Sequence, residues 1–143
     1  LWESNAILRY LADTHADGGL WRGSPRERAL ADRWMDWQFL YGEAQRHAFV
    51  NLVRKAPGER DMAAVERSVA ACAKMLAVLE DALGRSPWLS GQQFGIGDMP
   101  MGVFIHTWFA LPIERPEFPH IADWYRRLQE RRGYASHVMI PLS

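Results

Sequence analysis

The stretch FGIGDMPMGVFIHTWFAL, residues 94–111, decides the fold of this chain. Between Met99 and Leu111 the apolar residues fall on every side of a helix, so the pattern predicts a helix without a water-facing side. These residues are Met99, Met101, Val103, Phe104, Ile105, Trp108, Phe109 and Leu111. The stretch is too short for a membrane span, which needs about 20 apolar residues. We therefore expect a buried central helix around which the other helices pack.

The start of this helix can be placed in two ways. Asp98 follows Gly95 by three residues, so its carboxylate can accept hydrogen bonds from the free N–H groups of a first turn that begins after Gly95. Pro100 would then be the fifth helical residue and would remove a backbone hydrogen bond. If Asp98 itself is the cap, Pro100 lies in the first turn, where a proline is tolerated. The sequence leaves both starts open.

The composition is that of one globular domain without a charge bias. The chain has 143 residues, 48% of them hydrophobic, and 17 basic residues balance 17 acidic ones. This balance gives no field that would attract nucleic acid or an anionic membrane. The only cysteine, Cys72, excludes an internal disulfide, and the five histidines lack the spacing of a metal site. We therefore expect a cytoplasmic protein without a metal, and the first residue, Leu1 rather than Met, leads us to expect residues upstream.

Further helices are predicted on both sides of the central one. The sequence SPRE, residues 24–27, is a capping box that opens a long helix. Residues 62–83 carry apolar side chains at alternating steps of three and four, a seam that includes Cys72 as a core residue rather than a nucleophile. A last amphipathic helix carries Ile121, Trp124 and Leu128 and stops near Gly133, followed by a tail that docks through Tyr134, Val138 and Ile140. No strand pattern interrupts this order, so we predict an all-α helical bundle.

The first residues of the chain predict a short opening helix. Ile7, Leu8 and Leu11 recur at helical spacing, and Ser4 is the candidate N-cap. A capping role explains Ser4 without any ligand.

A mixed polar and aromatic face on the long helix is a second candidate site. Tyr41, Gln45 and Phe49 follow one another at spacings of four, with Arg46 beside them. This face is either the partly exposed shoulder of an ordinary bundle helix or one wall of a substrate pocket. His106, the only histidine of the central helix, is either a satisfied core residue or part of the same pocket on a neighbouring helix.

Three motifs resemble the cytosolic glutathione transferases, and those of bacteria in particular. WLSG at residues 88–91, followed by FGIGD, resembles the capping motif of the family's helical domain, although Gly95 stands where the family usually has Ser or Thr. The opening ESNAILRYLA resembles the start of the third helix of the family's thioredoxin-like domain, and the helix with WMDW at residues 34–37 is also similar. The resemblance implies the family's C-terminal helical domain over residues 24–143. It also implies that residues 1–17 are the last helix of a thioredoxin-like domain that is otherwise missing.

This resemblance implies an enzyme that conjugates glutathione, as a substrate, to a small hydrophobic electrophile. In the family, the acid and serine that match Glu3 and Ser4 bind the γ-glutamyl end of glutathione. That role is physically reasonable, because the free N–H groups and dipole of a helix start attract a carboxylate and Glu3 can meet an ammonium. The residues then expected in the electrophile pocket are Tyr41, Gln45, Arg46, Phe49 and His106.

The same resemblance limits what this chain does alone. The family's thiol-activating residue lies in the domain that is missing here, so no catalytic residue can be named and the chain alone is expected to be inactive. The family's dimers imply a homodimer. The alternative is a non-catalytic interaction module, because helical domains of this type also occur in translation factors and stress regulators.

Overall fold

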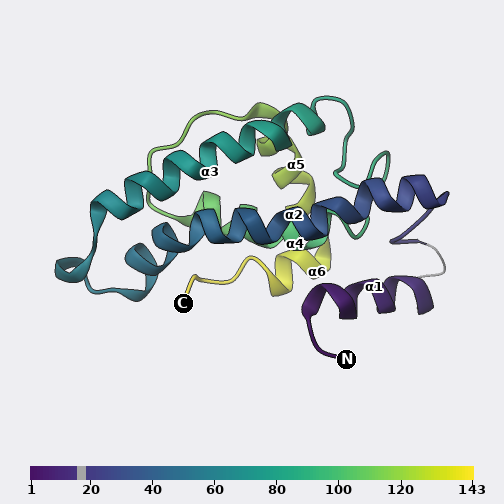
Figure 1. Cartoon of the computed structure of the whole chain (residues 1–143), viewed down its shortest axis with the longest axis horizontal. Coiled ribbons are helices and arrows are strands. Elements are labelled where there is room, and N and C mark those ends of the chain that lie inside the picture. Colours follow the sequence, from purple (N-terminus) through teal and green to yellow (C-terminus); the bar gives the residue numbers. More distant parts are fainter. Residues whose placement is uncertain (16–18) are drawn as a thin grey trace.

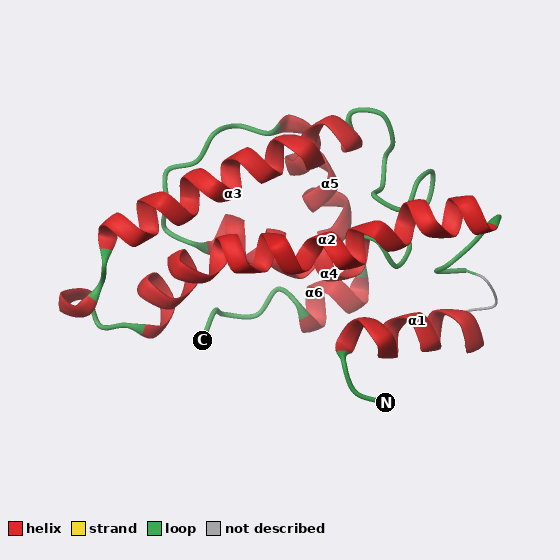
Figure 2. Cartoon of the chain, viewed as in Figure 1, coloured by secondary structure: helices red, strands yellow, loops and turns green. Residues whose placement is uncertain are grey.

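The computed structural model describes residues 1–15 and 19–143, and its described part is built from helices (Figures 1 and 2). In order they are α1 (Ser4–Thr14), α2 (Pro25–Phe49), η1 (Val50–Arg54), η2 (Pro57–Glu59), α3 (Met62–Leu83), α4 (Asp98–Ala110), α5 (Pro119–Gln129) and α6 (Arg132–His137). The β pairing found among these residues is one isolated bridge, between Trp88 and Gly91. The all-α prediction is therefore confirmed. The predicted boundary at Asp17 lies outside the described residues.

The bundle is built on α2 and α3, which run side by side as an antiparallel pair (Figure 1). The capping box of α2 is formed as predicted, because the Ser24 hydroxyl accepts from the Glu27 N–H at 3.3 Å and the Glu27 carboxylate accepts from the Ser24 N–H at 2.7 Å. α4 packs against α2 and α5, and Cys72 of α3 lies in the core between them without exposure. Among residues 1–15 and 19–143, none of the helices has the length and apolar character needed to span a membrane.

The central helix α4 is buried on most of its circumference but not on all of it. Met101, Ile105 and Trp108 are buried, whereas Val103 is 48% exposed. The prediction of a helix without a water-facing side is therefore wrong for the strip of α4 on which Val103 lies. The reason is that α4 packs on α2 and α5 over its other sides, and Val103 borders an open cleft.

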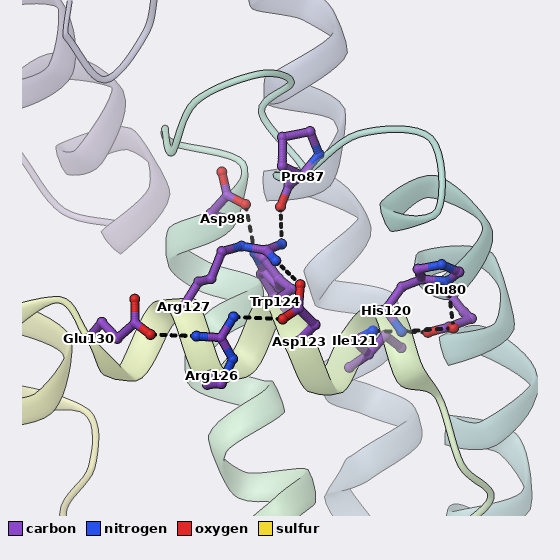
Figure 3. A network of polar contacts seen from close by, with 10 residues as sticks. All are labelled: Glu80, Pro87, Asp98, His120, Ile121, Asp123, Trp124, Arg126, Arg127 and Glu130. Atoms are coloured by element: carbon purple, nitrogen blue, oxygen red, sulfur yellow. Dashed lines mark hydrogen bonds and ion pairs between the residues drawn. The ribbon is translucent and has the colours of Figure 1, made fainter.

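The start of α4 is fixed by the carboxylate of Asp98. α4 begins at Asp98 itself, so Pro100 lies in the first turn, where its missing N–H removes no helical bond. One carboxylate oxygen accepts from the Leu89 N–H at 2.8 Å and from the Trp124 indole N–H at 2.9 Å (Figure 3). The other accepts from the Gly95 N–H at 3.0 Å and from the Ser90 N–H at 3.2 Å. One buried side chain thus joins the preceding loop, α4 and α5.

The hydroxyl that the motif lacks at Gly95 is supplied from elsewhere in the loop. The Ser90 side chain accepts from the Gly97 N–H at 3.0 Å, as an N-cap hydroxyl does. A Cβ at Gly95 would lie 2.9 Å from that hydroxyl oxygen and 2.6 Å from the Leu20 carbonyl oxygen. Glycine therefore fits this position because Ser90 and Leu20 occupy the space of a side chain.

The last helices differ from the prediction in their boundary. α5 ends at Gln129 and a separate α6 follows, because the backbone at Arg131 is extended, with φ −82° and ψ 120°. The start of α5 is held by Glu80 of α3, whose carboxylate accepts from the His120 and Ile121 N–H groups at 3.0 and 2.9 Å (Figure 3). Tyr134 of α6 docks as predicted, since its hydroxyl donates to the Gly102 carbonyl at 2.6 Å. The prediction is wrong for the Ile140 side chain, which is 55% exposed.

The Asp98 network predicts a large loss of stability in Asp98→Asn. The amide keeps the shape but replaces one acceptor oxygen with an NH₂ group, which leaves two buried N–H donors facing another donor. We expect the free energy of unfolding to fall by about 3 kcal/mol in urea denaturation. The control is Asp123→Asn, which removes an exposed carboxylate that pairs with Arg126 and should leave the midpoint near that of the unchanged protein. Equal midpoints for the unchanged protein and Asp98→Asn would contradict this account.

Candidate functional site

The start of α1 combines backbone strain with free hydrogen-bond donors. Glu3 precedes the helix with φ 69° and ψ 113°, and it is the one non-glycine residue with positive φ among those described. Such a conformation costs on the order of 1–3 kcal/mol and persists only where the surroundings hold it. The first helical bond runs from the Ile7 N–H to the Glu3 carbonyl, so the N–H groups of residues 4–6 have no acceptor within the helix.

Ser4 is exposed at this turn, but it is not the cap that the sequence suggested. It is the first residue of the helix, Glu3 is in the N-cap position, and no side-chain capping bond forms there. The reason is the positive φ of Glu3, which places the turn one residue earlier than a serine cap requires. The Ser4 hydroxyl and the free N–H groups therefore lie together at the positive end of α1.

α1 is fixed on α2 by polar contacts as well as by apolar ones. The Asn5 amide donates to the Met35 carbonyl at 2.7 Å in a buried position. The Arg9 guanidinium donates to Asp32 and to Asp36, both at 2.7 Å. Ala12 packs in a small apolar cluster with Ala31, Met35 and Ile96. The strained turn thus has a defined position relative to α2.

A cleft of about 390 Å³ lies between α2 and α4. Three of the predicted pocket residues, Gln45, Arg46 and Phe49, line it. Gln45 is itself buried, and its amide donates to the Phe104 carbonyl at 3.1 Å. The other lining residues are Gln38, Phe39, Gly42, Glu43, Val103, Phe104 and Thr107. The cleft is a mainly apolar depression with an arginine and a glutamate on its rim.

Tyr41 lies beneath this cleft and not in it. Its side chain has no exposed surface, and its ring stacks on Trp37 with centroids 6.0 Å apart. Its hydroxyl accepts from the Gln45 amide at 3.3 Å, and Tyr41 belongs to the same buried core cluster as Cys72. Burial raises the pKa of Tyr41 above its ordinary value and raises the pKa of the Cys72 thiol to about 11. Both groups are therefore neutral near pH 7.

His106 is also outside the cleft, because both of its ring nitrogens are engaged elsewhere. Nε2 lies 3.3 Å from the Ile140 carbonyl, which can only accept, so Nε2 carries a hydrogen. Nδ1 lies 2.9 Å from the Tyr125 hydroxyl, which donates to it in the neutral ring. Of the five predicted pocket residues, Gln45, Arg46 and Phe49 thus line the cleft, whereas Tyr41 and His106 do not.

Sequence reasoning missed two features of these sites. Gly42 allows α2 and α4 to approach, because a Cβ there would lie 3.0 Å from the Phe104 ring. A glycine inside an otherwise regular helix was the available signal. Asn5 was read only as part of a helix start, and its buried contact with α2 has no signature in the sequence beyond a polar residue next to Ser4.

A larger groove of about 760 Å³ lies on another side of α2, toward the end of α3. Its lining includes Trp34 and Trp37 of α2, Trp88, and the exposed side chains of Leu30 and Val78. It contains none of the predicted site residues. In the part of the chain that the structure describes, no group of three or more His, Cys, Asp or Glu could hold a metal ion.

This helical bundle belongs to a known class of protein. A family model described as "Glutathione S-transferase, C-terminal domain" matches residues 62–127, from α3 into α5. Glutathione S-transferase GstB of Escherichia coli is 41% identical over 144 residues, which cover all of this chain and 69% of that protein. The chain therefore belongs to the glutathione S-transferase family, and its residues 62–127 match the C-terminal domain of that family.

Two further proteins are similar to this chain. A theta class glutathione S-transferase from Xanthomonas axonopodis pv. citri, with glutathione bound, is 46% identical and superposes with a TM-score of 0.96. The match covers all of this chain and 69% of that one. The disulfide-bond oxidoreductase YfcG of Escherichia coli is 30% identical over 136 residues, which are 92% of this chain and 60% of that protein.

The environment of Cys72 predicts that its thiol is inert in the folded protein. A thiol with a pKa of about 11 is almost wholly protonated at pH 8, and this one has no exposed surface. An aromatic disulfide reagent should therefore label no thiol at pH 8 in buffer and one thiol per chain in urea. Rapid labelling of the folded protein would show that the pocket around Cys72 opens or that the thiol is activated.

Proposed function

We propose that this chain supplies the helical, electrophile-binding part of a glutathione transferase that joins glutathione to small hydrophobic electrophiles. The observation that supports this most directly is the strained Glu3–Ser4 turn. Its exposed hydroxyl and free N–H groups suit a carboxylate, and the cost of its conformation suggests a binding role. The related Xanthomonas enzyme is known with glutathione bound.

In this proposal, Glu3 and Ser4 bind the γ-glutamyl end of glutathione. The Ser4 hydroxyl and the N–H groups of the first turn of α1 donate to the carboxylate, and the Glu3 carboxylate accepts from the ammonium. Two opposite charges of the ligand thereby meet two complementary groups one residue apart. No residue of this chain is proposed to activate the thiol.

Ser4→Ala should weaken glutathione binding by the full-length protein. Loss of one hydroxyl that donates to a charged group is expected to cost about 1 to 3 kcal/mol of binding free energy, measured by calorimetry. The control is Thr14→Ala, which removes a hydroxyl at the opposite end of α1 and should leave the affinity unchanged. An unaltered affinity in Ser4→Ala would refute the glutathione site and favour a non-catalytic interaction module.

The electrophile is proposed to bind in the cleft between α2 and α4. Phe49 and the apolar side chains of Phe39 and Val103 provide its apolar walls, and Arg46 provides a cation at the rim. Gln45 presents a fixed amide from below. Tyr41 and His106 are left out of this contact set, since the first is fully buried and the second is bonded to Tyr125 and Ile140.

Substitutions at the cleft should change the choice of electrophile more than the affinity for glutathione. Phe49→Ala should lower the turnover of bulky aryl electrophiles relative to small ones, because it removes an apolar wall. Arg46→Gln should lower the relative turnover of electrophiles that carry an acidic group. Arg67→Gln on α3 lies outside the lining and is the matched control. An identical ranking of electrophiles in all three variants would remove the cleft from the proposal.

The protein is further proposed to act as a cytoplasmic homodimer. The lining of the groove between α2 and α3 includes Leu30 and Val78, which are 38% and 52% exposed. Leu40 of α2 is 64% exposed. Apolar surface of this kind is commonly covered in an assembly. We propose that a second copy of the chain covers the side of the bundle that carries this groove. We also propose that conjugation requires groups beyond the residues of this chain.

A further inference from the structure

Asn5 is the residue that connects the strained turn to the rest of the bundle. It is 4% exposed, immediately follows Ser4, and its amide donates to the Met35 carbonyl of α2 at 2.7 Å. The other polar contacts of α1 lie farther along the helix, with Arg9 bonded to Asp32 and Asp36. Asn5 is therefore the side chain whose loss frees the beginning of α1 while its later turns remain attached.

The need for such an anchor follows from the backbone at Glu3. A non-glycine residue at φ 69° returns to ordinary φ values unless its neighbours hold it. Within α1 itself, the Glu3 carbonyl accepts from the Ile7 N–H at 3.0 Å. Toward the rest of the bundle, the Asn5 amide joins α1 to α2 two residues after Glu3. If the turn relaxes, the Ser4 hydroxyl and the free N–H groups no longer converge.

We propose that Asn5 is a positioning residue for glutathione, which holds the Glu3–Ser4 turn in its strained, binding-competent conformation. This inference rests on the proposed glutathione site. When only a fraction of the molecules has the competent turn, the apparent affinity falls by that fraction, while the occupied enzyme is unchanged. Asn5 thus acts on the affinity for glutathione and not on the chemical step.

The first test is Asn5→Ala in the full-length protein, with glutathione affinity from calorimetry and turnover of an activated aryl chloride. We expect the dissociation constant and the KM for glutathione to rise about tenfold, with kcat at saturating glutathione nearly unchanged. The matched control is Arg28→Gln, which cuts the exposed contact with Asp13 at the far end of α1 and should change neither constant. An equal loss of affinity in Arg28→Gln would show that only the docking of α1 matters, and would overturn the proposal.

The second test is a double-mutant cycle with Glu3→Gly. Glycine adopts positive φ without strain, so the turn no longer needs an anchor. Glu3→Gly is expected to weaken binding through the lost carboxylate. Adding Asn5→Ala to that variant should then cause little further loss. A further tenfold loss in the double variant would overturn the proposal, because Asn5 would then act by a route other than the turn.

Two more results separate this inference from the function on which it rests. If Ser4→Ala weakens glutathione binding and Asn5→Ala does not, the positioning role fails and the glutathione site stands. If Ser4→Ala has no effect, the glutathione site itself fails, and the positioning role fails with it. If Asn5→Ala does not fold, Asn5→Ser provides the same comparison. Serine keeps a hydrogen-bond donor, but its side chain is too short to reach the Met35 carbonyl, which the Asn5 amide contacts at 2.7 Å.

Discussion

The bundle depends on the buried carboxylate of Asp98. Its two oxygens accept four N–H groups, which come from the loop before α4 and from Trp124 of α5. A buried carboxylate is costly unless such donors surround it, so the loop, α4 and α5 are each constrained by the same group. The position of α4 follows from this constraint, and with it the wall of the cleft that Val103 and Phe104 form.

The two candidate sites share α2 as their common support. α1 is attached to one side of α2 through Asn5 and Arg9, and the cleft lies along the same helix toward its C-terminal half. A ligand at the start of α1 and a ligand in the cleft would therefore be positioned by one rigid element. Reactions between two bound molecules gain most from such a fixed relative position.

The sequence predicted the elements of this fold better than the directions of its side chains. The capping box at Ser24, the seam with Cys72 and the all-α bundle follow from local patterns, which depend on neighbours within one or two turns. Whether Tyr41 faces a cleft or the core depends on the crossing of α2 and α4, which no local pattern specifies. The same limit applies to His106, whose partners Tyr125 and Ile140 come from later in the chain. The break between α5 and α6 was missed because Arg131 has no helix-breaking signature.

The spacing of Tyr41 predicted that its side chain lines the cleft. It is instead buried beneath the cleft and supports the residues that line it. Gln45 donates to both the Tyr41 hydroxyl and the Phe104 carbonyl, so its amide is fixed from two directions. Gly42, one residue beyond Tyr41, allows the Phe104 ring to approach α2. Because Tyr41 stays neutral and hydrogen-bonded, it keeps a polar floor under an apolar cleft without placing a charge there. The polarity of the cleft floor thus depends partly on Tyr41, which does not line the cleft, and partly on the lining residues that it holds in place.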